Sequence, residues 1–153
     1  MARSKSEHLT DAVLAVFRAN GRLIAWGDGF AAPFGLTSAR WQMLGALALA
    51  ERPLTAPQIA AAMGVTRQGA QKQLNLLADD GLVSREPNPN HQRSPLYRLT
   101  RRGESVYAAT RRSWDAHTEQ LAKSLELDDL LAAKRVLAFL ADRHVTDTEN
   151  DPA

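Results

Sequence analysis

Four polar side chains recur at positions 68, 71, 72 and 75, a spacing that places them on one face of an α-helix. They are Gln68, Gln71, Lys72 and Asn75. Gln and Asn can pair bidentately with adenine in the major groove, and Lys donates to guanine or to phosphate. None of the four is acidic. The pattern predicts a DNA-recognition helix, and the alternative is an ordinary amphipathic helix with a polar outer face.

The residues before this helix have the pattern of a helix-turn-helix. Thr55 and Gln58 have the spacing of a capping box, which starts a short helix that ends before Gly64. Thr66 then caps the helix that carries the polar face. Thr66 and Arg67 stand at its N-terminal end, where recognition helices meet bases and phosphates. We expect both to contact DNA, and we include Thr55 in the same set.

A β-hairpin is predicted directly after the helix-turn-helix. Residues 82–85 and 96–99 have strand character and flank a loop with three prolines and two asparagines. His91 and Arg93 lie in this loop, and a guanidinium at a hairpin tip can enter a narrow minor groove. The alternative is a surface loop without function. Because it follows a helix-turn-helix, the hairpin completes a predicted winged helix with two DNA contacts at its tip.

Predicted helices flank this lobe on both sides. One spans about residues 9–30, a second runs from Thr37 or Ser38 to about Ala50, and a third covers about 101–126. Asp128 and Asp129 start a last helix, and the polar tail after Thr146 is expected to be disordered. The terminal helices carry more apolar surface than one domain needs, so part of it is expected to bury against a second copy. The predicted dimer contacts are Leu9, Val13, Leu125, Leu130, Leu137 and Leu140.

Composition restricts the function further. The chain of 153 residues is long enough for one domain, has no cysteine, and contains no apolar run that could span a membrane. Residues 52–112 carry ten Lys/Arg and four Asp/Glu, although a solvated basic face would also explain this excess. Asp115, His117 and Glu119 do not share a helical face, so we expect no metal site. We expect no cofactor and no catalysis, because no phosphate loop or nucleophile motif occurs. We also expect a cytoplasmic location.

These residues, read in order, resemble the MarR family of winged-helix transcription regulators over about residues 8–145. The resemblance is carried by the following segments: Leu54-Thr55, Gln58-Ile59-Ala60, Gly64-Val65-Thr66-Arg67-Gln68, Asp80-Gly81-Leu82-Val83, Arg93-Ser94-Pro95-Leu96 and Leu99-Thr100 with Gly103. Many members carry an Asp-Arg-Arg-like wing, whereas this chain has His91-Gln92-Arg93 and keeps only the last arginine, without the acidic residue that stabilises the wing in those members.

The resemblance implies a homodimer on a palindromic DNA site, and most members are repressors released by a small, often aromatic ligand. It places a ligand pocket between the dimer helices and the DNA-binding lobe. The expected lining residues are Arg22, Trp26, Phe30, Trp41, Tyr107, Arg111 and Trp114. For any one of them, a core aromatic or a surface arginine is the alternative interpretation. With no cysteine, thiol-based sensing is excluded and a reversibly bound aromatic molecule is the expected signal. The alternative is a regulator without a ligand that is controlled only by its own abundance.

The sequence therefore predicts a single, mostly α-helical domain over 1–153 with a small β-hairpin. A winged helix-turn-helix lobe occupies about 36–100, and dimerisation helices occupy about 8–32 and 101–145. The predicted function is a sequence-specific, ligand-responsive repressor that binds double-stranded DNA. Two alternatives are open: a non-specific architectural DNA-binding protein, and a winged-helix module that binds protein instead.

Overall fold

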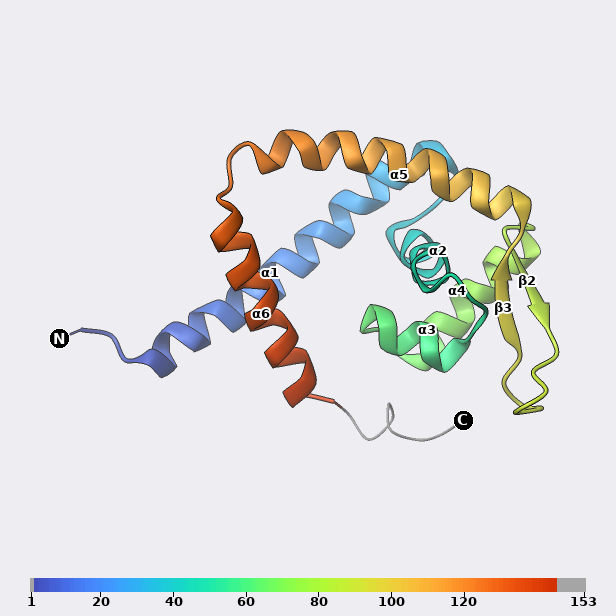
Figure 1. Cartoon of the computed structure of the whole chain (residues 1–153), viewed down its shortest axis with the longest axis horizontal. Helices are drawn as coiled ribbons and strands as arrows, with labels where there is room; N and C mark the ends of the chain where they lie inside the picture. Colours follow the sequence, from blue (N-terminus) through green and yellow to red (C-terminus); the bar gives the residue numbers. More distant parts are fainter. Residues whose placement is uncertain (1, 146–153) are drawn as a thin grey trace.

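The computed structural model describes residues 2–145, so the predicted disordered tail, 146–153, lies outside the described residues. The chain is mostly helical and carries one small sheet (Figure 1). The elements are α1 (Lys5–Ala31), η1 (Ala32–Phe34), α2 (Ser38–Ala50), β1 (Leu54–Thr55), α3 (Ala56–Met63), α4 (Arg67–Asp79), β2 (Val83–Glu86), β3 (Leu96–Leu99), α5 (Arg101–Ala122) and α6 (Leu127–Arg143).

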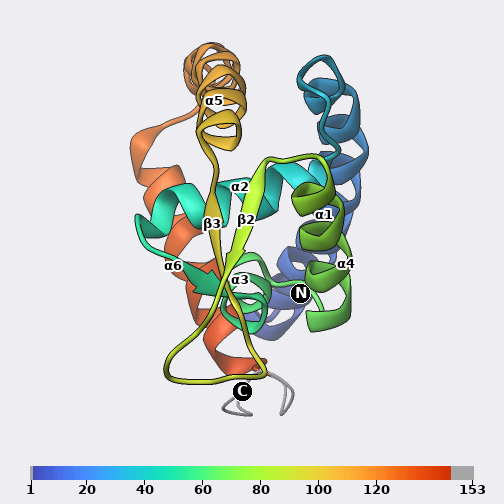
Figure 2. The same ribbon diagram turned by 90° about the vertical axis from the view of Figure 1, so that its right-hand side faces the viewer.

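The winged-helix lobe is built by α2, α3, α4 and an antiparallel sheet with the order β1-β3-β2. Its core includes Leu44 of α2, Ile59 of α3, Leu74 and Leu77 of α4, and Tyr97 of β3, all fully buried. Figure 2 shows the loop between β2 and β3 at the end of the molecule opposite α5. The predicted hairpin is confirmed, with β2 one residue later than expected, and β1 is an additional strand that the sequence did not indicate.

Hydroxyl groups begin the helices of this lobe, and also α5, as predicted. The side chains of Thr37, Thr66 and Thr100 each accept a hydrogen bond from the backbone N–H three residues later. Thr55 and Gln58 form the expected capping box, in which the Gln58 side chain also accepts from the Thr55 backbone N–H at 2.9 Å. These local interactions fix where each helix starts, and therefore which residues face outward on α4.

Several predicted boundaries need correction. A capping box between Ser4 and Glu7 starts α1 at Lys5, before the predicted position 9, and lowers the pKa of the Glu7 carboxyl through the Ser4 backbone and side-chain hydrogen bonds. The end of α2 at Ala50 is as predicted, and the next residue, Glu51, adopts a left-handed conformation with φ of 54°. α5 stops at Ala122 instead of 126, and α6 begins at Leu127.

Two of the terminal helices, α1 and α5, pack on α2 of the lobe. α5 lies over α2 (Figure 1). α6 and the first half of α1 lie on the left of this view, away from α3, α4 and the strands. No residue of α6 is buried. Within residues 2–145, no helix has the length and apolar character needed to cross a membrane.

Candidate nucleic-acid interface

The recognition helix α4 separates into two faces. Ala70, Leu74 and Leu77 are buried against the lobe, and α3 and α4 pack closely on one another. The predicted DNA-contacting residues Gln68, Lys72 and Asn75 are exposed, while Arg67 and Gln71 are half-buried. Exposed amides and an ammonium on one helical face can bond to base edges and phosphates.

A hollow of about 240 Å³ separates the start of α4 from the wing. It is lined by Arg67, Gln68 and Gln71 from α4 and by Arg93 from the wing. Ala56, Pro57, Ser94 and Pro95 complete the lining. The fold thus brings four of the predicted DNA-contacting residues together from two separate segments.

The amide of Gln71 is held by two hydrogen bonds within the protein. Its Nε2 donates to the hydroxyl oxygen of Tyr97 at 2.8 Å and to Oδ1 of Asn75 at 3.0 Å. Tyr97 is fully buried on β3, so the recognition helix is tied to the wing through a side chain that sequence reasoning missed. The sequence held one sign of this contact: Tyr97 lies between Leu96 and Arg98 in a predicted strand, so its side chain points to the face of the hairpin opposite to theirs.

Asn88 closes the loop at the wing tip. Its Nδ2 donates to the carbonyl oxygen of Ser94 at 2.9 Å, and its Oδ1 accepts from the backbone N–H of Asn90 at 3.1 Å. This amide therefore links the two ends of the loop at the wing tip. Arg93 is exposed at this tip, whereas His91 is half-buried, with an Nδ1 that has no hydrogen-bond partner among the described residues.

Thr55 lies in a different environment from the other predicted contacts. It is 7% exposed, and its hydroxyl accepts from the Gln58 backbone N–H at 3.3 Å. Its side chain therefore positions α3 and offers little surface to DNA.

Two arginines of the basic segment, residues 52–112, are held by contacts within the protein. Arg98 pairs with Glu86 at 2.8 Å, and Arg102 donates to the backbone oxygen of Asp80 at 2.7 Å. Outside the segment, Arg40 pairs with the Asp80 carboxylate at 2.7 Å and joins α2 to the end of α4. The positive charge counted in the sequence is therefore only partly available to phosphates.

Four of the predicted ligand-binding aromatics form one cluster. Trp26 stacks on Phe30 with centroids 5.0 Å apart, Trp41 lies 5.0 Å from Phe30, and Trp114 lies 5.3 Å from Trp41. His117 was missed as a member: its ring stacks on Trp26 at 4.6 Å. The cluster joins α1, α2 and α5.

A groove of about 530 Å³ lies beside this cluster, between α1 and α5. It is lined by the predicted residues Arg22, Trp26 and Trp114, together with His117 and Leu121. Arg18 adds a second guanidinium to the lining. Two cationic groups beside aromatic rings could receive an aromatic carboxylate.

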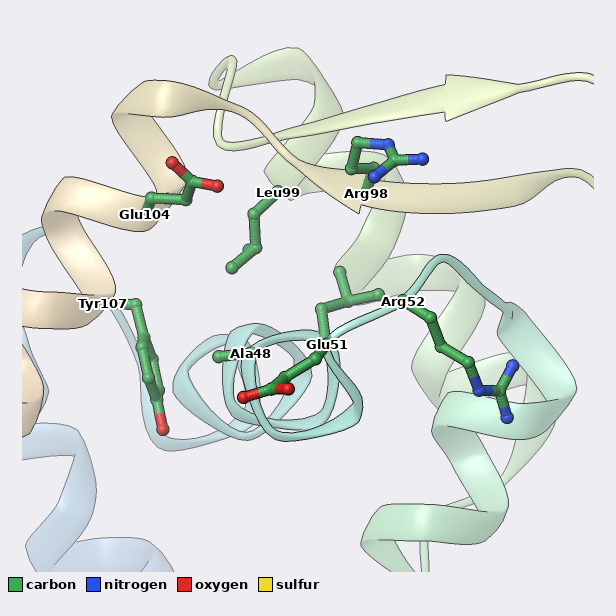
Figure 3. A pocket seen from close by; sticks show the side chains of 8 residues that line it. Ala48, Glu51, Arg52, Arg98, Leu99, Glu104 and Tyr107 are labelled. Atoms are coloured by element: carbon green, nitrogen blue, oxygen red, sulfur yellow. The ribbon is translucent and has the colours of Figure 1, made fainter.

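The other two predicted ligand contacts lie elsewhere. Tyr107 lines a separate pocket of about 350 Å³, opposite Ala48 of α2 and Glu51, which follows α2, and below Leu99 of β3 (Figure 3). Arg111 is exposed and donates to Asp115 at 2.7 Å, a hydrogen bond that raises the pKa of its guanidinium, with a smaller contribution from Tyr107. The fold does not bring these two residues to the aromatic cluster.

The six predicted dimer contacts all retain solvent-accessible surface in the single chain. Leu9, Leu125, Leu130 and Leu137 are between 39% and 52% exposed, and Val13 and Leu140 are half-buried.

Among residues 2–145, no three His, Cys, Asp or Glu side chains gather closely enough to hold a metal ion.

Comparison with known proteins agrees with this geometry. The MarR family model matches residues 34–94. An uncharacterized protein of Mycobacterium tuberculosis is 42% identical over 104 residues, covering 68% of this chain and 71% of that protein. A crystallised MarR family transcription regulator superposes with a TM-score of 0.74 and 29% identity, covering 90% of this chain and 91% of that one.

Two further solved structures share the fold and contain DNA. A mutant of Escherichia coli MarR in complex with operator DNA superposes with a TM-score of 0.71 at 21% identity, covering 90% of this chain and 99% of that one. M. tuberculosis MosR with DNA superposes with a TM-score of 0.70 at 23% identity, covering 86% and 94%. The chain has a recognition helix and a wing and matches the family model, so it belongs to the MarR family and is a DNA-binding transcription regulator.

Proposed function

We propose that this regulator is a sequence-specific repressor that binds a palindromic operator as a homodimer and is released by a small aromatic ligand. The observation that carries the proposal is the hollow between α4 and the wing. There Arg67, Gln68, Gln71 and Arg93 converge, and Lys72 and Asn75 extend the same polar surface along α4. Amide groups can distinguish bases by pairing with their edges, whereas contacts to phosphates alone would supply affinity without sequence preference.

The exposed apolar surface supports the dimer. Large apolar side chains face solvent on α1, at the end of α5 and on α6. The most exposed are Phe17 at 70%, Leu127 at 69% and Leu23 at 58%. Soluble monomers rarely expose contiguous apolar patches of this kind, and a two-fold partner would cover the same surface on both chains. Such a dimer presents two recognition helices, which suits a palindrome with half-sites about one DNA turn apart.

The groove between α1 and α5 supports ligand control. Arg18 and Arg22 could pair with a carboxylate, and Trp26 and Trp114 could stack on an aromatic ring. The structure of NadR, which superposes with a TM-score of 0.73, was solved with 4-hydroxyphenylacetate bound. Because the aromatic cluster joins α1, α2 and α5, a ligand here could change the angle between the dimer helices and the lobe. A ligand that prefers the altered angle lowers DNA affinity.

One set of experiments tests the three parts of the proposal. Sequences selected from random DNA should be bound at least about 1,000-fold more tightly than a scrambled duplex in the same salt. Sedimentation of the free protein should show a dimer. Aromatic carboxylates should quench tryptophan fluorescence and release the operator. Equal affinity for all duplexes would favour an architectural DNA-binding protein, and no DNA binding would favour a protein-interaction module.

A further inference from the structure

The hydrogen bonds of Gln71 limit what it can offer to DNA. A primary amide has two N–H protons and one carbonyl oxygen. Both protons of Gln71 are used inside the protein, one toward the Tyr97 hydroxyl at 2.8 Å and one toward Asn75 Oδ1 at 3.0 Å. Only the carbonyl oxygen is left. Gln71 in this state accepts hydrogen bonds from DNA and donates none.

This restriction changes the base that Gln71 can select. A glutamine usually recognises adenine by donating to N7 and accepting from the N6 amino group at once. An acceptor-only glutamine keeps just the second contact, which cytosine offers equally through its N4 amino group. Guanine and thymine present carbonyl oxygens in the major groove, which an acceptor repels.

We propose that Tyr97 is a specificity-determining residue: its buried hydroxyl holds the Gln71 amide so that Gln71 selects adenine or cytosine at one position in each half-site. The assignment rests on the proposed sequence-specific binding. Tyr97 is suited to this task because it is fully buried on β3 and paired on both sides, opposite Leu54 of β1 and Arg85 of β2. Its hydroxyl therefore has a fixed position, and the hydrogen bond to this hydroxyl fixes the orientation of the Gln71 amide.

The first experiment selects the operator from random DNA and then measures affinity for all four bases at each position. The wild-type protein should have one position per half-site at which adenine and cytosine bind about equally, and guanine and thymine about tenfold more weakly. Tyr97→Phe removes only the hydroxyl and frees one N–H of Gln71. Discrimination at that position should then fall below about threefold while other positions keep theirs. Gln68→Ala, on the same helix, is the matched control and should change a different position.

A second pair of measurements keeps the test decisive if Tyr97→Phe does not fold. Gln71→Glu has acceptors only, and the Tyr97 hydroxyl can donate to it, so this variant should keep the preference for adenine and cytosine. In the operator, replacing the selected adenine by purine removes the N6 amino group alone. That replacement should weaken wild-type binding about tenfold and leave Gln71→Ala binding unchanged.

The possible results separate the two proposals. One result is a protein that selects a sequence but prefers guanine or thymine at the position that Gln71→Ala affects. In that case the Gln71 amide donates to DNA, and Tyr97 does not act as proposed. Unchanged base preferences in a folded Tyr97→Phe protein would overturn the assignment alone. A protein that selects no sequence at all would overturn the proposed function and this assignment with it.

Discussion

Gly103 of α5 packs against the backbone of Leu82, just before β2, and Gly103→Ala should destabilise the protein. The residue is buried in the first turn of α5, where its N–H donates to the Thr100 hydroxyl at 3.0 Å. A methyl group at this position would overlap the carbonyl oxygen of Leu82 and lie 3.0 Å from its carbonyl carbon. That oxygen also accepts from the Thr100 backbone N–H at 3.1 Å, so it is not free to move away.

The size of the effect follows from three contributions. Overpacking against fixed backbone costs up to about 3 kcal/mol. Weakening the hydrogen bond between Leu82 and Thr100 costs about 1 kcal/mol. Alanine in place of glycine in a helix returns about 1 kcal/mol, which leaves a net loss of about 3 kcal/mol. For a chain of this size, the melting temperature should fall by roughly 6–12 °C. Because Leu82 leads into β2, the displaced wing should also weaken DNA binding.

Thermal denaturation followed by circular dichroism measures this effect, at one fixed protein concentration because association changes the midpoint. The matched control is Gly29→Ala in α1, where an added methyl meets nothing within 4 Å. Gly29→Ala should keep or slightly raise the melting temperature. If Gly103→Ala melts within about 2 °C of Gly29→Ala, the packing argument is wrong.

Three further predictions address DNA, assembly and ligand. Arg93→Ala should lower operator affinity and reduce the slope of log affinity against log salt by about 0.9 for each phosphate that Arg93 neutralises in the wild type. Titrations at several salt concentrations will measure this slope. An unchanged slope would exclude phosphate binding by Arg93. Leu137 is 47% exposed in the single chain, so Leu137→Asp should be costly only if a partner covers it. Sedimentation should show that this variant is no longer a dimer, whereas Leu49→Asp, at a residue 67% exposed in the winged lobe, should stay dimeric. Trp41→Phe should keep the fold and weaken the release of operator DNA by aromatic carboxylates, measured by fluorescence and gel shift; a normal response would place the ligand away from the aromatic cluster.

The sequence predicted those features that depend on residues close together in the chain. Thr37, Thr55, Thr66 and Thr100 were each expected to start a helix, and each does so through a bond to a residue three positions later. The two faces of α4 followed from helical spacing alone. β1 was missed because a strand of two residues has no pattern of its own and exists only through its pairing with β3.

The limits of the prediction at the site have the same physical origin. Helical spacing placed Gln71 beside Gln68 and Lys72, but its amide bonds to Tyr97, 26 residues further along the chain. The contact depends on how closely the hairpin folds back against α4, which no local pattern encodes. His117 joins the aromatic cluster because α1 brings Trp26 to α5. Local rules thus identify the polar face that can meet DNA, while packing between distant segments decides which hydrogen-bonding groups on that face are still available to a base.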